Sequence, residues 1–293
     1  MNDFGFLYQK YVSDFEEYLK SYTDKLKTNP AILGESMAYS LLNGGKRIRP
    51  VLALATADAL GLDKSEILPF ALALEMIHTY SLIHDDLPAM DNDDFRRGKP
   101  SNHKQFGEAN AILAGDALLN EAYSLCFCEC LKGERQVLAS AFLNACAGAN
   151  GMIAGQCAYL LFSTSDTETT EEDLSYIYEQ KTGKLLLAPV VMSSILSGNK
   201  DSILLEQFGK LLGKLFQMTD DILDITGDFE TVGKTIGKDE KENKLTCVRL
   251  YGLEGAKIRA DMCAKDCHTI LEGINGETAF LSELIDYILN RSR

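Results

Sequence analysis

The sequence predicts an all-α protein, and three observations support this fold class. Apolar residues recur at three- and four-residue steps over residues 4–26, as they do on one face of an amphipathic helix. Later segments, such as VLALATADALG (51–61) and NAILAGDALLNEAYSLCF (110–127), are rich in Ala and Leu with few β-branched runs. The sequence contains no convincing alternating strand pattern, and no Asn-Gly hairpin between strand-like runs.

The expected helices follow one another from the N-terminal side. After the helix at 4–26, the glycine-rich turn NGGKRIRP (43–50) opens the helix that contains 51–61. The apolar stretch ILPFALALEMIHTYSLIHDD (67–86) forms another helix that ends in two aspartates. The stretch QVLASAFLNACAGANGMIAGQ (136–156) continues the helical pattern.

Two polar loops are expected in the second half of the chain. In the segment 163–173, Thr170 and Asp173 have the spacing of a capping-box variant. The segment 226–244 is lysine-rich and contains glycine, and a loop of this length is typical of disorder or of a lid over a site. No linker interrupts the helical pattern, so residues 1–293 are expected to form a single domain.

Composition and charge exclude several classes of protein. A hydrophobic content of 46% with only 6 prolines allows a large core, and a net charge of -14 argues against binding nucleic acid through phosphate contacts. The first twenty residues are acidic and amphipathic, unlike a targeting segment. No uninterrupted apolar run approaches the ~18–20 residues of a membrane span. We therefore expect a cytoplasmic protein that binds neither nucleic acid nor a membrane.

The eight cysteines do not show a common metal or disulfide pattern. Cys126, Cys128 and Cys130 have C-x-C-x-C spacing, which differs from that of zinc pairs. On a helix, Cys126 and Cys130 share a face and Cys128 does not. Cys263 and Cys267 lie close in sequence without a second ligand pair. We expect reduced, partly buried thiols.

A dense run of carboxylates begins at the end of the apolar stretch, in SLIHDDLPAMDNDDFRRGKP (81–100). One helical stripe carries His78, Ser81, Leu82 and Asp85. Because Pro88 disfavours helical geometry before it, we expect the helix to end near Leu87 and the chain to bring Asp91 back toward Asp85. Crowded carboxylates favour a cation between them, and an open, oxygen-lined site suits Mg²⁺.

A second acidic cluster lies in LFQMTDDILDITGD (215–228). Asp220 and Asp224 are one turn apart on one helical face, with Asp221 beside them and Gln217 one turn earlier. Two such clusters can face each other across a bundle and share several cations. Either cluster alone also fits a solvated helix end, but the two together, each followed by basic residues, favour metal binding.

Basic residues accompany both acidic clusters. The turn at 43–50 offers Lys46, Arg47 and Arg49, together with glycine N–H groups and a helix start that can bind an anion. Further basic residues are Arg96, Arg97, Lys181, Lys184, Lys234, Lys238 and Lys244. Each alone is ordinary surface charge, but their clustering favours a polyphosphate ligand.

The order and spacing of these motifs resemble those of the trans-isoprenyl diphosphate synthase family. The matching segments, between about residues 40 and 245, are GGKRIRP, DDLPAMD followed by RRGKP, KTGKL, FQMTDDILD and GKTIGKD. The gap of four residues between Asp86 and Asp91 is similar to that of bacterial members that make farnesyl diphosphate. The resemblance implies one large helical bundle around a central active-site cavity, and a homodimer.

The resemblance also implies an activity. Family members join an allylic diphosphate, dimethylallyl or geranyl, to isopentenyl diphosphate with Mg²⁺, and this chain would form farnesyl diphosphate. About three Mg²⁺ ions, replaceable by Mn²⁺, are implied. Their implied ligands or supporting residues are Asp85, Asp86, Asp91, Asp220, Asp221 and Asp224. The positions that match contacts to the allylic diphosphate are Arg96, Lys181, Lys234 and Lys244. Thr182 and Gln217 match positions that face the carbocation.

The second substrate places a different demand on the site. Isopentenyl diphosphate must keep its diphosphate, so fixed cationic side chains suit it better than metal ions. The matching positions are Lys46, Arg49, His78 and Arg97. Tyr80, five residues before Asp85, matches an aromatic floor that limits the product to fifteen carbons, and Ser81 lies one turn before Asp85.

Two alternatives stay open. A geranyl or geranylgeranyl diphosphate synthase would use the same motifs with a cavity of different depth. A non-catalytic subunit of a heteromeric prenyltransferase would be expected to lack Asp or Lys residues in the motifs, and none is missing. One departure from the family pattern is Cys247, which stands near a common aromatic position and can alter the packing of the long loop.

Overall fold

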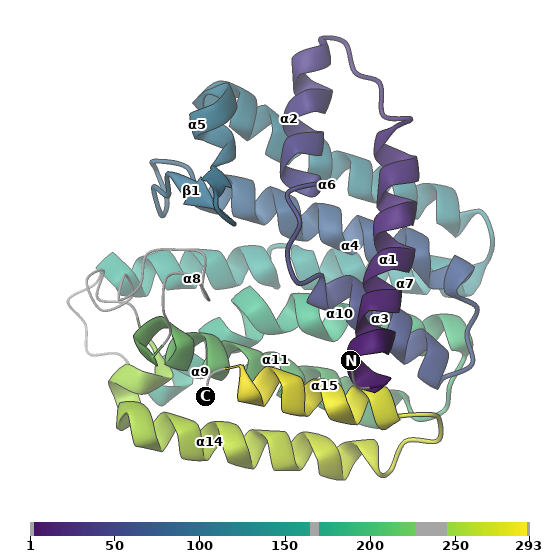
Figure 1. Cartoon of the computed structure of the whole chain (residues 1–293), viewed down its shortest axis with the longest axis vertical. Helices are drawn as coiled ribbons and strands as arrows, with labels where there is room; N and C mark the ends of the chain where they lie inside the picture. Colours follow the sequence, from purple (N-terminus) through teal and green to yellow (C-terminus); the bar gives the residue numbers. More distant parts are fainter. Residues whose placement is uncertain (1–2, 165–169, 227–244, 292–293) are drawn as a thin grey trace.

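The molecule is built from long helices packed around two central ones (Figure 1). The computed structural model describes residues 3–164, 170–226 and 245–291. The elements are α1 (Asp3–Thr23), α2 (Ala31–Leu41), α3 (Ile48–Ala59), α4 (Lys64–Asp85), β1 (Phe95–Arg96), β2 (Lys99–Pro100), α5 (Asn102–Phe106), α6 (Glu108–Cys130), α7 (Glu134–Ala147), α8 (Met152–Thr164), α9 (Glu171–Ile177), η1 (Tyr178–Gly183), α10 (Lys184–Ser197), α11 (Ser202–Thr226), α14 (Cys247–Leu271) and α15 (Ala279–Asn290). The prediction of an all-α fold is confirmed.

Helices α4 and α10 form the centre of the bundle. Helix α10 contacts α3, α4, α7 and α11, while α4 also packs against α3 and α6. Both central helices are buried on nearly every side, as the fully buried Phe70, Leu72 and Leu74 of α4 illustrate. Helix α14 packs on α11 at the edge of the molecule, and α15 lies against both (Figure 1). The catalytic candidates at the end of α4 and on α11 therefore extend from a rigid core.

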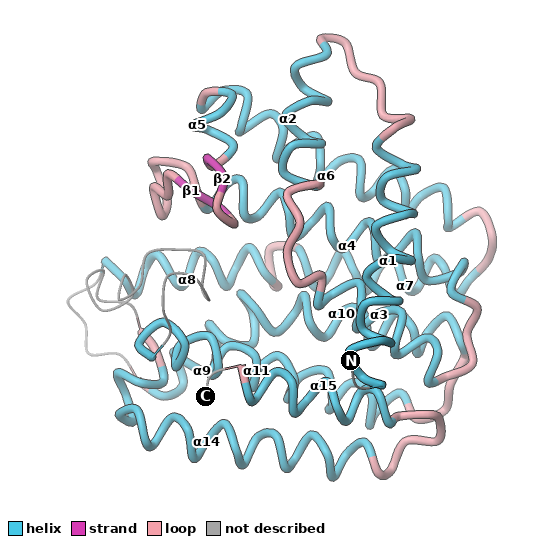
Figure 2. The backbone as a smooth tube through the Cα atoms, viewed as in Figure 1, coloured by secondary structure: helices cyan, strands magenta, loops and turns pink. Residues whose placement is uncertain are grey.

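A short hairpin was not predicted from the sequence. Strands β1 and β2 pair antiparallel, with Phe95 opposite Pro100 and Arg96 opposite Lys99 (Figure 2). Strands of two residues are too short to show an alternating pattern, which explains why sequence periodicity missed them. The hairpin matters because it fixes the direction of Arg96.

Several predicted boundaries are confirmed. The turn at 43–50 opens α3 at Ile48. The capping box at the start of α9 is present, with Thr170 Oγ1 accepting from the Asp173 N–H at 3.2 Å. The first helix was expected to reach residue 26, but α1 ends at Thr23.

A π-helix, η1, joins α9 to α10 and packs closely against its neighbours. A Cβ on Gly155 of α8 would lie 2.2 Å from the backbone nitrogen of Lys181, and one on Gly213 of α11 would lie 2.7 Å from Gly183 Cα. Glycines at these two positions let the three backbones approach. Since π-helical turns recur at functional sites, η1 is a candidate carrier of functional residues.

All eight cysteines are free. Cys126 is buried, Cys130 half-buried and Cys128 exposed, which agrees with the predicted faces of α6. Burial raises the pKa of Cys126, Cys146 and Cys247 to about 12, so these thiols stay protonated near neutral pH.

Three helical stretches among the described residues are long and apolar enough to cross a membrane by length and composition alone: Lys64–Asp85, Glu108–Cys130 and Glu134–Ser163. None of the three is an uninterrupted apolar run, so the expectation based on such runs did not include them. The first is 72% buried inside the fold, so most of its apolar surface packs in the protein's own core. The other two are 33% buried and leave an apolar face uncovered.

A buried ion pair connects the first four helices. The guanidinium of Arg47 is fully buried and donates to Glu75 at 2.7 Å, to Glu16 at 2.6 Å and to the Leu41 carbonyl at 2.7 Å. The sequence grouped Arg47 with the anion-binding residues of the turn. The structure corrects this assignment, because these partners already engage the guanidinium.

We predict that Glu75→Ala lowers the free energy of unfolding by about 3–5 kcal/mol, because it leaves the buried Arg47 charge without its closest buried partner. Urea denaturation measures the loss. The control is Lys64→Ala, which removes an exposed pair with Asp14 and should cost less than about 1 kcal/mol. Equal losses for the two variants would contradict the structural role of Glu75.

Candidate active site

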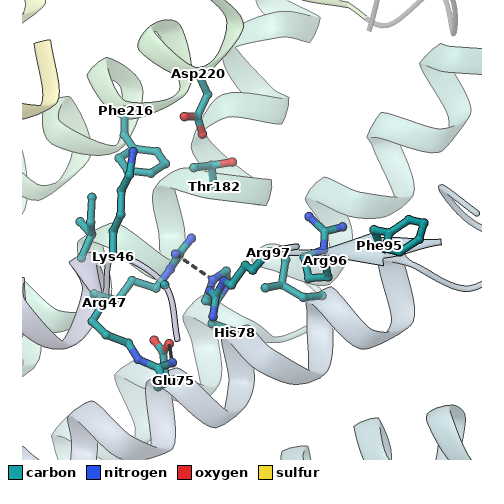
Figure 3. Close-up of a pocket in the computed structure, with 14 residues that line it drawn as sticks. Lys46, Arg47, Glu75, His78, Phe95, Arg96, Arg97, Thr182, Phe216 and Asp220 are labelled. Atoms are coloured by element: carbon teal, nitrogen blue, oxygen red, sulfur yellow. Dashed lines mark hydrogen bonds and ion pairs between the residues drawn. The ribbon is translucent and has the colours of Figure 1, made fainter. Parts of the chain in front are cut away.

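Two cavities meet beside α4, and together they contain most of the predicted site residues. The first has a volume of about 410 Å³ and a largely cationic wall (Figure 3). The second has a volume of about 510 Å³ and is mostly apolar. The residues that line both are Arg49, His78, Leu82 and Thr182. A molecule with a charged head and an apolar tail could occupy the pair.

The first acidic motif folds as predicted. Helix α4 ends at Asp85, and the chain then turns back so that the Asp91 N–H donates to the Asp85 carbonyl at 2.8 Å. The Asn92 N–H donates to the Leu87 carbonyl at 3.1 Å, and Asn92 adopts a positive φ of 50°. The turn thus brings Asp91 next to Asp85.

The Asp85 carboxyl group is in an environment that disfavours its charge. Burial raises its pKa to about 6, and the negative charge of Asp91 adds to the rise, while the Lys181 ammonium opposes it. A cation bound between the two carboxylates would offset both the burial and the repulsion. This electrostatic demand supports a metal site at the edge of the apolar cavity.

Asp86 supports a neighbouring side chain. It is buried, and its carboxylate accepts from Arg96 Nε at 3.0 and 3.2 Å and also from Arg96 Nη2. Arg96 lies 3.4 Å from Asp93 as well. Asp86 therefore fixes the guanidinium that the resemblance assigns to the allylic diphosphate.

The second acidic motif is part of a connected polar chain. Thr182 Oγ1 donates to Gln217 Oε1 at 2.6 Å, and Gln217 Nε2 donates to Asp221 Oδ1 at 3.0 Å. Asp221 Oδ2 accepts from the Cys247 N–H at 2.8 Å and from the Tyr178 hydroxyl. Buried Asp221 thus holds η1, α11 and α14 together.

Asp220 and Asp224 differ in exposure. Asp220 faces the cationic cavity across from His78 and Arg97 (Figure 3). Asp224 is buried, one turn further along α11. Of the three aspartates in this motif, Asp220 lines the cavity.

Two residues of this region were not predicted. Tyr178 is buried, and burial together with the Asp221 charge raises its pKa well above the ordinary value, so it stays a hydrogen-bond donor. Arg291 lies 2.9 Å from Asp220 and stacks over the Phe216 ring at 3.8 Å. Arg291 is far from Asp220 in the sequence, so the pair could be recognised only once α15 was known to pack on α11.

The cationic cavity concentrates positive charge. Arg49 Nη1 lies 3.2 Å from His78 Nε2. Burial and the guanidiniums of Arg49 and Arg97 hold the pKa of His78 well below its usual value, so the imidazole is neutral. Burial also lowers the pKa of Arg49 to about 10 and lowers that of Lys46. An anion in this cavity would relieve the repulsion among these groups.

Arg97 depends on the glycines of the turn. Its guanidinium donates to the Gly44 carbonyl, and a Cβ on Gly45 would lie 2.6 Å from Arg97 Cζ. Gly45 has a φ of +112°, which glycine tolerates best. Gly45 therefore leaves the space that the Arg97 guanidinium occupies, and Gly44 supplies the carbonyl that accepts from it.

The wall of the apolar cavity includes Tyr80, Ser81 and Asp85 of α4. Tyr80 is buried and meets the His84 ring edge-on, with the ring centroids 5.7 Å apart. A Cβ on Gly115 of α6 would lie 2.2 Å from His84 Nε2, so the glycine makes room for this imidazole. Tyr80 is thus fixed by a packed neighbour.

Two predicted residues, Lys234 and Lys244, lie outside the described residues. Among the residues that are described, no group of three or more His, Cys, Asp or Glu side chains could hold a metal ion alone. Mg²⁺ is commonly bound by one or two carboxylates together with substrate phosphates and water. The Asp85 and Asp91 pair fits this kind of site.

Comparisons with known proteins agree with the predicted resemblance. The family model described as polyprenyl synthetase matches residues 30–272. The chain is 45% identical to the farnesyl diphosphate synthase of Micrococcus luteus over 264 residues, which cover 89% of this chain and 90% of the relative. It is also 45% identical to geranylgeranyl pyrophosphate synthase 7 of Arabidopsis thaliana, with coverage of 89% and 77%.

Solved structures give the same result. A geranyltransferase from Helicobacter pylori, complexed with magnesium and isoprenyl diphosphate, superposes with a TM-score of 0.85 at 35% identity, covering 99% of this chain and 97% of that one. The match extends over the whole fold, including the helices that carry both acidic motifs. The chain therefore belongs to the polyprenyl synthetase family.

Proposed function

We propose that this trans-prenyltransferase joins dimethylallyl or geranyl diphosphate to isopentenyl diphosphate and releases farnesyl diphosphate and diphosphate. The observation that supports this most directly is a pair of adjoining cavities. Asp220 lines the cationic cavity, and Asp85 lines the apolar cavity. An allylic diphosphate would place its hydrocarbon tail in the apolar cavity. Isopentenyl diphosphate would occupy the part of the cationic cavity that Lys46, Arg49 and Arg97 line.

The diphosphate group would leave the allylic carbon with help from groups at the cavity edge. When bound, Mg²⁺ neutralises the charge that develops on the departing diphosphate. Asp85, Asp91 and Asp220 would hold about three such ions, and Mn²⁺ would substitute for them. Lys181 and Arg96 would bind phosphate oxygens directly, with Arg96 oriented by Asp86.

Isopentenyl diphosphate would be held without metal ions. The fixed cations of the first cavity, Lys46, Arg49 and Arg97, would bind its diphosphate, which must stay attached to carbon. Because His78 is neutral, it would contribute a hydrogen bond and no charge. The site would thus bind diphosphate without promoting its departure.

The chemical step would occur where the cavities meet. The allylic C–O bond breaks, the double bond of isopentenyl diphosphate supplies the electrons of the new C–C bond, and the released diphosphate takes the proton that is lost. Thr182 lines both cavities, and the Gln217 oxygen that accepts its hydrogen bond would lie with it near the positive charge that develops. These oxygen dipoles would stabilise the carbocation.

The product length would follow from the apolar cavity. Tyr80 lines this cavity five residues before Asp85, and its ring would limit the growing chain to fifteen carbons. Identity to relatives does not decide the length, because a farnesyl and a geranylgeranyl synthase are equally similar to this chain. The proposal of a fifteen-carbon product therefore rests on the position of the Tyr80 ring.

We further propose that the protein is a cytoplasmic homodimer. The exposed apolar side chains of α6 and α7 include Ile112, Leu113, Phe127, Val137 and Leu138. A second copy that covers this face would remove apolar surface from water without a membrane.

We predict that Asp85→Asn lowers turnover at least about 100-fold, because the site loses a metal-binding carboxylate that stabilises the leaving group. Product formation from geranyl and isopentenyl diphosphates with Mg²⁺ measures this effect. The control is Asp94→Asn, which removes an exposed partner of Lys104 and should retain turnover. Near-normal turnover of the Asp85 variant would exclude its assigned role.

Tyr80→Ala should lengthen the product, because removal of the ring opens the cavity wall beyond Ser81. Mass spectrometry of the products, with excess isopentenyl diphosphate, measures chain length. The exposed Tyr176→Ala variant should leave the product at fifteen carbons. If Tyr80→Ala also makes only the fifteen-carbon product, another residue limits the length.

His78 should make the protein acid-sensitive. Its folded pKa is depressed, so only the unfolded chain takes up this proton below about pH 6.5, and stability falls as the pH falls. The wild type should lose up to about 1.4 kcal/mol more per pH unit than His78→Asn between pH 6 and 5. Urea denaturation at each pH measures the slopes, and identical slopes would mean that His78 is protonated in the fold.

A further inference from the structure

We infer that Tyr159 of α8 is a positioning residue that holds the Lys181 ammonium for the allylic diphosphate. The Lys181 Nζ lies 3.4 Å from the centroid of the Tyr159 ring, in cation–π contact. This inference deepens the proposed function, on which it rests. It concerns a residue in none of the motifs that the sequence identified.

The same helix also fixes the backbone of Lys181. Gly155 lies one turn before Tyr159 on α8, and a Cβ there would meet the Lys181 nitrogen at 2.2 Å and its Cα at 2.6 Å. Residues four apart share a helical face. One face of α8 therefore sets both the backbone of Lys181, through Gly155, and its ammonium, through Tyr159.

The position of the ammonium connects it to the metal site. Lys181 and Asp85 line the wall of the same apolar cavity. A lysine side chain has a flexible four-carbon stem, so an unrestrained ammonium would occupy several rotamers. The Tyr159 ring selects a rotamer near Asp85.

An aromatic ring and a carboxylate would have different effects at this position. A carboxylate would neutralise the lysine and compete with phosphate oxygens for its N–H donors. The ring holds the ammonium through its quadrupole and leaves the full positive charge in place. Tyr159 thus positions Lys181 without reducing its attraction for a diphosphate.

The test measures binding of geranyl diphosphate with Mg²⁺, without isopentenyl diphosphate, by isothermal titration calorimetry on the full chain. Tyr159→Leu should raise its dissociation constant about 3- to 30-fold, as expected for a lost cation–π contact. Tyr159→Phe keeps the ring and should restore binding to within about twofold of the wild type. Isopentenyl diphosphate without Mg²⁺ should bind Tyr159→Leu as it binds the wild type.

A double-mutant cycle separates positioning from structural effects. In a Lys181→Met background, Tyr159→Leu should cause no further loss of geranyl diphosphate binding. Tyr251→Leu is the matched control, because it removes a cation–π pair with Arg259 outside both cavities and should leave binding unchanged.

Four outcomes would overturn the inference. Equal losses for both diphosphates, or a full further loss in the Lys181→Met background, would indicate a general structural role for Tyr159. Normal geranyl diphosphate binding by Tyr159→Leu would show that the ring does not position Lys181. A wild type that binds no geranyl diphosphate would instead overturn the proposed function itself, and the inference with it.

Discussion

The arrangement of the site depends on the buried carboxylate of Asp221. Three donors from three elements converge on it: the Tyr178 hydroxyl of η1, the Gln217 amide of α11 and the Cys247 N–H at the start of α14. A buried charge is stable only when it is well hydrogen-bonded, so these elements are held in one relative position. The backbones of Lys181 and Thr182 are held in place with the rest of η1.

The two Asp-Asp motifs share a division of roles. In each, the first aspartate lines a cavity and the second is buried as support. Asp85 faces the apolar cavity while Asp86 fixes Arg96, and Asp220 faces the cationic cavity while Asp221 fixes η1 and α14. The crowded carboxylates of the sequence thus have two different electrostatic environments: protein donors satisfy Asp221, and under the proposed function a cation would satisfy Asp85.

Much of the fold and site could be predicted from the sequence, because helical periodicity, Pro88 and motif spacing are local signals. The return of Asp91 to Asp85 followed from such a signal and is observed. Arg47 was misassigned because its burial against Glu75 depends on how α3 and α4 pack. Tyr178, Tyr159 and Arg291 were missed for the same reason, since their partners lie on other helices. The lysines of the segment 226–244 lie outside the described residues, so their roles stay predictions.

The position of Tyr80 on a helix has a consequence for how product length could change. One turn of α4 advances about 5.4 Å. Each condensation lengthens the main chain of the product by four carbons, and this extension is close to one helical turn. A bulky side chain moved by one helical turn would therefore shift the limit by about one condensation. Under the proposed function, the pitch of an α-helix would set the increments in which relatives of this protein change the size of their products.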